Sequence, residues 1–119
     1  MPDRFVILHH RLGDGEHWDL MLERGDILLT WQLLHEPIDR ASLPIPARRI
    51  GDHRKAFLDY EGPLTGNRGT VRRVDSGMVE FEENTPQYAR FTLSGNRLRG
   101  TFVLTLEAEG WTFESAGGP

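Results

Sequence analysis

Short apolar segments separated by glycine- and aspartate-rich turns run through most of this chain, and this pattern constrains its fold most. Segments rich in β-branched and aromatic residues that end at turn residues predict strands. We expect strands at 4–9, 16–23, 27–34, 48–50, 70–74, 78–82, 88–93, 98–106 and 111–113. Such short strands, with at most one short helix, predict an all-β fold: a small closed or nearly closed antiparallel β-barrel. A β-sandwich is the alternative.

The turns near the N-terminus are tight enough to join consecutive strands as an antiparallel meander. Residues 12–15 (Leu-Gly-Asp-Gly) and 24–26 (Arg-Gly-Asp) have hairpin-turn chemistry. Residues 75–77 and 94–96 are read as hairpin turns for the same reason. A helix over 27–34 is the alternative to a strand there, but that segment is short and has no N-cap signature.

Two longer connections are expected. Residues 35–47 contain three prolines and predict a long surface loop, a kind of segment that often lines sites. Asp52 is placed to N-cap a single helical turn over 54–58. A glycine-punctuated loop follows at 62–69. Its segment 66–69 could cradle an anion on backbone N–H groups, although a turn that needs glycine freedom is the alternative.

Composition excludes several classes of function. The 119 residues predict one domain, 1–119, with a frayed tail at 115–119. The chain has no cysteine, which excludes disulfides, thiolate metal sites and cysteine nucleophiles. No signal sequence and no apolar run of about 20 residues is present. We therefore expect a cytoplasmic protein without a membrane partner, and the sequence leaves the oligomeric state open.

The charge pattern points two ways. A net charge of −4 and a pI of about 5.7 argue against a broad electrostatic surface for nucleic acid. However, Lys55 is the only lysine among the fourteen basic residues, and the others are arginines, whose planar fork suits phosphate. A high genomic GC content would produce the same bias. A local basic groove on an acidic domain is therefore compatible with the sequence.

The segment 16–23 carries polar residues that a strand core does not explain. Alternation places His17, Asp19 and Met21 on one face of the strand and the intervening apolar residues on the other. A hairpin would bring His10 to the same end of the sheet. Two imidazoles and one carboxylate form a common open site for a divalent metal. Incidental histidines are the alternative, and a lone histidine such as His35 is most simply read as solvent-facing.

Several blocks of residues together resemble a known family. They are Phe5–His10 with His17-Trp18-Asp19 and Leu22-Glu23; Thr30-Trp31 with Pro37; Asp52-His53 with Glu61-Gly62; Gly66-x-x-Gly69-x-Val71 with Asp75-x-Gly77; and Phe91-x-Leu93-x-Gly95-x-Arg97-Leu98-x-Gly100-x-Phe102-x-Leu104. In this order, from Phe5 to Phe113, the chain resembles the 3′-phosphoesterase domain of bacterial ATP-dependent DNA ligase D. That family includes stand-alone proteins.

The resemblance implies a compact β-barrel whose metal-dependent site removes a 3′-phosphate or a 3′-ribonucleotide from DNA or RNA ends during repair by non-homologous end joining. The usual metal is Mn²⁺, with Zn²⁺ or Co²⁺ as alternatives. The implied partners are a primer-template 3′ end and separate ligase and polymerase repair proteins. By the same resemblance His10, His17 and Asp19 hold the metal. His10 is preferred over His9 because it aligns with one extra residue in the following loop.

The resemblance also implies roles on the phosphate side of the site. His53 would contact the scissile phosphate or act as the general acid. Arg54 and Arg11, like Tyr60 and Arg68, are candidates to compensate for two family residues that this chain lacks, although no motif places them. Two positions depart from the family pattern: Met21 replaces an arginine and Phe57 replaces a tyrosine. These losses favour a second hypothesis, a degenerate member that binds metal and a phosphorylated ligand without turnover. A plain β-barrel interaction module is a third.

Overall fold

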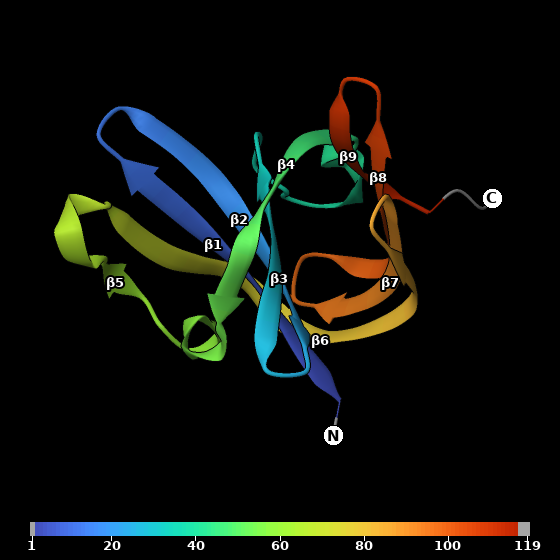
Figure 1. The fold of residues 1–119 in the computed structure, drawn as a ribbon, viewed down its shortest axis with the longest axis horizontal. Helices are drawn as coiled ribbons and strands as arrows, with labels where there is room; N and C mark the ends of the chain where they lie inside the picture. Colours follow the sequence, from blue (N-terminus) through green and yellow to red (C-terminus); the bar gives the residue numbers. More distant parts are fainter. Residues whose placement is uncertain (1, 117–119) are drawn as a thin grey trace.

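The computed structural model describes residues 2–116, and its nine strands form a single antiparallel sheet (Figure 1). The strands are β1 (Asp3–Leu12), β2 (Gly15–Arg24), β3 (Ile27–Leu33), β4 (Ile45–Arg54), β5 (Gly62–Pro63), β6 (Thr70–Thr85), β7 (Tyr88–Gly95), β8 (Arg99–Glu107) and β9 (Gly110–Ser115). Pairing follows the order β1-β2-β3-β4-β9-β8-β7-β6, and β6 also pairs with β1. The predicted fold class, all-β with a nearly closed antiparallel sheet, is confirmed.

Helical structure within residues 2–116 is limited to three short 3-10 turns: η1 (Arg40–Ser42), η2 (Lys55–Leu58) and η3 (Thr65–Asn67). The predicted strand over 27–34 is confirmed as β3, and the helix alternative for it is wrong. No helix in the described part of the chain is long and apolar enough to span a bilayer.

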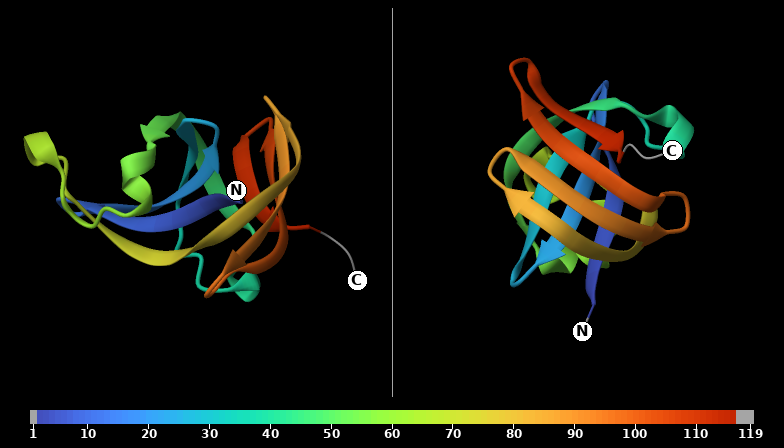
Figure 2. Two further views of the ribbon diagram at one scale, coloured as in Figure 1. Left: turned by 90° about the horizontal axis from the view of Figure 1, so that it is seen from below. Right: turned by 90° about the vertical axis from the view of Figure 1, so that its right-hand side faces the viewer.

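The curved sheet buries apolar side chains on both of its faces. The larger cluster fills the inside of the ring and includes Phe5, Leu20, Phe91, Phe102 and Phe113. A smaller cluster lies on the outer face, where Val6, Leu8, Met21 and Leu28 pack against Leu58, Val71, Phe57 and Leu64. The segment 55–69 therefore covers the outer face of β1–β3. Figure 2 shows the green η2 turn lying beside β1.

The predicted hairpin turn at 75–77 is wrong, because β6 runs without a break through it. Asp75 is buried, and its carboxylate accepts hydrogen bonds from the backbone N–H groups of Asn96 (2.8 Å) and Leu98 (2.9 Å). Gly77 lies against the next strand, since a Cβ there would be 2.0 Å from the carbonyl oxygen of Ser94. Asp75 thus stabilises a distant turn, and Gly77 allows β6 and β7 to lie close together.

The segment between β3 and η2 also differs from the prediction. The strand expected at 48–50 is part of β4, which pairs with β3 and, at its start, with β9. The loop predicted at 35–47 therefore ends before Ile45. Asp52 lies inside β4 and does not cap η2, whose N-cap Arg54 makes no side-chain cap hydrogen bond. The helical turn itself is present.

The glycine-punctuated loop contains the two-residue strand β5 and the turn η3. At the C-terminus, the predicted frayed tail is wrong at Ser115, which pairs with Phe102 in the β8–β9 ladder. It is also wrong at Ala116, whose backbone N–H donates to the carbonyl of Thr101 at 2.8 Å. The remaining residues of that prediction, 117–119, lie outside the described residues.

Candidate metal centre

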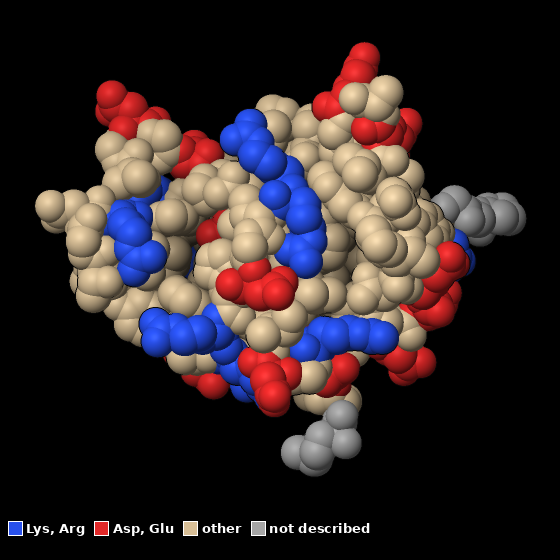
Figure 3. Space-filling model, in the orientation of Figure 1, with Lys and Arg blue, Asp and Glu red and all other residues tan. Residues whose placement is uncertain are grey.

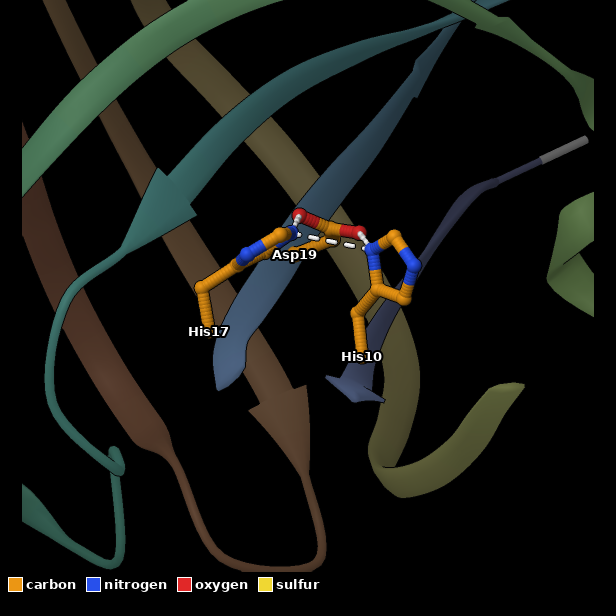
Figure 4. A group of neighbouring side chains, drawn as sticks. All are labelled: His10, His17 and Asp19. Carbon is orange, nitrogen blue, oxygen red and sulfur yellow. Dashed lines mark hydrogen bonds and ion pairs between the residues drawn. The ribbon is translucent and has the colours of Figure 1, made fainter. Parts of the chain in front are cut away.

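His10 and His17 face each other across the β1–β2 hairpin, as the sequence predicts. They are direct partners in the β1–β2 register. His10 Nδ1 lies 3.0 Å from His17 Nε2, and Asp19 stands two residues further along the same face of β2. Figure 4 shows the three side chains converging from the two neighbouring strands. One ligand atom from each lies within 4.8 Å of the others.

The tautomer of the neutral His10 ring is set by a backbone carbonyl. Its Nε2 lies 2.7 Å from the carbonyl oxygen of Arg68, which can only accept a hydrogen bond. His10 Nε2–H is therefore the donor, and in the neutral ring Nδ1 holds the lone pair that points toward His17. A backbone carbonyl that fixes a histidine tautomer in this way is typical of metal-ligating histidines.

Asp19 contributes a buried carboxylate that the protein leaves incompletely satisfied. The residue is only 3% exposed, and its Oδ1 has no hydrogen-bond partner among the described residues. Oδ1 lies 3.1 Å from His17 Nε2, and Oδ2 lies 3.6 Å from His10 Nδ1. A buried carboxylate oxygen without a donor is costly unless a cation or a proton accompanies it.

These donors fit a divalent ion. Ligand atoms at about 2.0–2.2 Å from one ion are separated by about 3 Å when they occupy adjacent positions. The separations between the two imidazole nitrogens and the Asp19 oxygens, 3.0, 3.1 and 3.6 Å, agree with that requirement. The Asp19 oxygen without a partner is the feature of these three side chains that best suits a cation.

The three side chains lie in a pocket of about 340 Å³ on the outer face of the sheet. Of the predicted phosphate-side residues, His53 and Arg54 of β4 line this pocket, as do both departures from the family pattern, Met21 and Phe57. Arg11 is exposed at the end of β1 and is not among the lining residues. In Figure 3, Lys and Arg side chains lie on both sides of a hollow left of the centre of the face shown.

His53 is half-buried and held by its own strand. Its Nδ1 lies 2.9 Å from the carbonyl oxygen of Gly51, so Nδ1–H donates and Nε2 is free for a ligand. Its ring meets Phe57 edge-on, with centroids 5.5 Å apart. His53 can therefore present a single nitrogen of fixed tautomer to the pocket.

The other histidines are placed elsewhere. His9 stacks on Trp18 with ring centroids 4.8 Å apart, and its Nε2 lies 2.7 Å from Glu16. His35 is exposed in the connection between β3 and β4. Neither belongs to the cluster, so the geometry agrees with the preference for His10 over His9, and the metal-binding role of His10 stays a prediction.

An ion pair ties the covering segment to the sheet. Lys55 Nζ lies 2.8 Å from Glu23 Oε2, and the backbone N–H of Arg4 donates to Glu23 Oε1 at 2.8 Å. The hydrogen bond from Lys55, assisted by the one from Arg4, holds the pKa of Glu23 below its ordinary value although burial opposes this. Glu23 thereby joins β2 to the start of η2, whose Phe57 lines the pocket.

The model of the DNA ligase D 3′-phosphoesterase domain matches residues 8–106 of the chain. The chain belongs to this family. Among curated proteins none matches it. The match to the DNA ligase D 3′-phosphoesterase domain includes all three members of the cluster together with His53, Arg54, Met21 and Phe57.

Two contacts of this DNA ligase D-type site were not predicted from the sequence. Gln32 Nε2 lies 3.3 Å from His17 Nε2, because Gln32 pairs with Asp19 in the β2–β3 register. The Gln32 contact could have been predicted by pairing the residues of the second and third predicted strands across their turn and keeping every second pair. The Arg68 carbonyl has no such signal, since its contact with His10 spans 58 residues.

Proposed function

We propose that the chain is a metal-dependent phosphoesterase that removes a 3′-phosphate or a 3′-ribonucleotide from the 3′ end of DNA or RNA during repair. The observation that supports this most is the convergence of His10 Nδ1, His17 Nε2 and the unpartnered Asp19 oxygen in a pocket that His53 also lines. The match to the DNA ligase D 3′-phosphoesterase domain supports the same chemistry. The proposed partners are a primer-template end and separate ligase and polymerase proteins.

In this proposal one set of residues binds the metal ion and another set contacts the phosphate. His10, His17 and Asp19 would hold the divalent ion, for which Mn²⁺ is the first choice and Zn²⁺ or Co²⁺ the alternatives. When bound, such an ion supplies Lewis-acid polarisation of a phosphoryl oxygen. His53 would use Nε2 either to bind the phosphate or to protonate the leaving oxygen. Arg54, which also lines the pocket, would offset phosphate charge.

A second candidate function follows from Met21 and Phe57. Met21 is 1% exposed and packs in the outer apolar cluster. The face of β2 that carries His17 and Asp19 therefore has no guanidinium at position 21. Phe57 brings no hydroxyl to the wall that it shares with His53. The absence of both groups favours a protein that binds metal and a nucleic-acid end without turnover.

One experiment separates the two functions. The metal-loaded protein is incubated with a primer-template that ends in a 3′-phosphate and with one that ends in a 3′-ribonucleotide. Product that disappears in both His17→Ala and Asp19→Ala but persists in His9→Ala supports the phosphoesterase. Metal binding without product from either substrate supports the binding protein instead.

A further inference from the structure

A second pocket, of about 380 Å³, opens beside the pocket of the metal centre. We call it the side pocket. Four residues line both pockets: Arg54, Phe57, Leu64 and Arg68. The side pocket is completed by residues of the segment 56–65, among them Tyr60 and Pro63. Because these four residues border both pockets, the two pockets are direct neighbours.

The walls of the side pocket are aromatic and apolar. Phe57 and Tyr60 meet edge-on with ring centroids 6.2 Å apart, and the Tyr60 hydroxyl donates to the carbonyl of Pro63, which holds the ring in place. Tyr60 nevertheless remains 38% exposed. A fixed, accessible aromatic ring is a stacking platform for a nucleobase, and such stacking tolerates any base.

The shared wall is positively charged. Neither Arg54 nor Arg68 forms an ion pair with an acid within residues 2–116. Arg68 is held in position by Thr65, to which its Nε donates at the carbonyl (2.8 Å) and its Nη2 at the hydroxyl (3.0 Å). An arginine that is fixed but unpaired is ready to bind an anion.

The single acid of the side pocket does not cancel this charge. Asp59 binds Arg4 at 2.8 Å, and this contact keeps the pKa of Asp59 below its ordinary value. Its negative charge is therefore already balanced by Arg4. The side pocket thus combines apolar, aromatic walls with two guanidinium groups that form no ion pair among the described residues, both on the wall that it shares with the pocket of the metal centre.

We propose that the side pocket binds the terminal nucleoside of the nucleic-acid end, with the base against Tyr60 and Phe57 and the 3′-phosphate between Arg54 and Arg68. This inference rests on the proposed function and names the form of its substrate, a nucleoside 3′-phosphate. A bare phosphate would use the arginines but not the aromatic wall. In this arrangement Arg54 and Arg68, which also line the pocket of the metal centre, supply the guanidinium that Met21 lacks.

Isothermal titration of the metal-free, full chain with a ribonucleoside 3′-monophosphate and with inorganic phosphate tests the inference. We expect the nucleotide to bind about tenfold tighter or better, since base stacking adds to the phosphate contact. Tyr60→Ala should remove most of this preference and leave phosphate affinity unchanged, which also shows that the variant is folded. Tyr60→Phe keeps the ring and should keep the preference.

Two further variants sharpen the test. Ala56→Asp places a carboxylate on the wall of the side pocket and should weaken nucleotide binding without depending on Tyr60. Leu106→Ala removes an exposed apolar side chain that lines neither pocket and should change nothing. Equal affinities for nucleotide and phosphate, no nucleotide binding at millimolar concentration, or equally tight binding of a phosphoserine peptide would each overturn the inference.

The result can be told apart from a failure of the proposed function, because binding to the metal-free protein needs no turnover. Preferential binding of the nucleotide without any product from the metal-loaded protein would support the side-pocket inference and refute the proposed phosphoesterase function. Product formation without nucleotide preference would remove the side-pocket inference alone.

Discussion

His10 and His17 are direct cross-strand partners, with His10 Nδ1 3.0 Å from His17 Nε2. Their meeting depends on the tight turn between Leu12 and Gly15, which fixes the register of the hairpin. A slip of one residue would turn one of the two imidazoles to the opposite face of the sheet, which is apolar and buried. The geometry of the candidate metal centre is therefore encoded locally, within a short stretch of chain.

The first prediction concerns metal binding. Mn²⁺ should raise the melting temperature of the native protein, because an ion that binds only the folded state stabilises it. His10→Ala, His17→Ala and Asp19→Asn should each abolish this rise. The measurement is thermal unfolding across a titration of Mn²⁺, Zn²⁺ and Co²⁺, followed by removal of the ion with a chelator.

His9→Ala is the matched control for this prediction. His9 neighbours His10 but stacks on Trp18 away from the cluster, so its loss should lower the baseline stability and leave the metal-induced rise intact. If no divalent ion stabilises the wild type, or if His9→Ala abolishes the rise and His10→Ala does not, the assignment of the centre is wrong.

The second prediction concerns Gly69, which follows the carbonyl that fixes His10. Gly69 has φ +91°, and a Cβ there would lie 2.0 Å from the carbonyl oxygen of Arg11. Gly69→Ala must displace the loop and with it the Arg68 carbonyl. We expect a loss of about 1–3 kcal/mol in stability and metal affinity lowered about tenfold or more.

Gly66→Ala provides the comparison. Gly66 also has positive φ, 70°, but a Cβ there meets nothing within 4 Å. This variant should lose some stability from backbone strain while keeping wild-type metal affinity. Equal metal affinities in Gly69→Ala and Gly66→Ala, measured by calorimetry, would show that the Arg68 carbonyl does not orient His10.

The third prediction concerns Asp75. Its carboxylate accepts three backbone N–H groups of the β7–β8 turn, from Asn96, Arg97 and Leu98. Asp75→Asn replaces one acceptor oxygen by a donor that faces these groups, and we expect a loss of about 2–4 kcal/mol in denaturant unfolding. The metal-induced rise in melting temperature should be unchanged, which separates a fold defect from a site defect.

Asp75 also shows why part of the fold could not be predicted. Aspartate, serine and glycine in sequence favour a turn, yet here the aspartate serves a turn some twenty positions later and the chain continues as a strand. The same limit applies to Asp52, which has the residue type of a helix cap but lies within β4. Local chemistry does not show which distant backbone will need a carboxylate.

The same limit separates the residues of the candidate site that the sequence predicts from those that it does not predict. His10, His17 and Asp19 were predictable because alternation and one hairpin bring them together. His53 was found only through the family resemblance, because β4 reaches the pocket through its pairing with β3. The contribution of Arg68 depends on how the glycine loop folds back onto β1, which no local pattern encodes. Arg11 is a candidate for phosphate binding that no motif places, and it does not line the pocket.

The fourth prediction concerns acid stability. The pKa of Glu23 is lowered in the folded protein by Lys55 and the Arg4 backbone N–H. Its stabilising contribution is therefore complete above the unfolded-state pKa, about 4.5, and declines as pH falls through the folded-state pKa. Glu23→Gln should be less stable than wild type at pH 7, by about 1–2 kcal/mol, and the difference should shrink as the pH approaches 3.

Glu80→Gln is the control for the acid prediction, since Glu80 is exposed on β6 and forms no ion pair within the described residues. Its difference from wild type should be small at every pH. A Glu23→Gln difference that stays constant from pH 7 to pH 3, measured by urea unfolding of the metal-free protein, would mean that the Glu23 charge contributes nothing.

The last prediction tests the departures from the family pattern. Phe57 is half-buried beside His53 and lines the metal pocket, so Phe57→Tyr adds a hydroxyl donor there without opening a cavity. We expect kcat/KM for 3′-phosphate release to rise about tenfold, the value of one hydrogen bond to a charged group. Phe81→Tyr adds the same hydroxyl away from both pockets and should have no effect. Met21→Arg should instead destabilise the protein, because it buries a guanidinium among Val6 and Leu28. Unchanged or lower activity in Phe57→Tyr would show that the missing hydroxyl does not limit phosphate recognition.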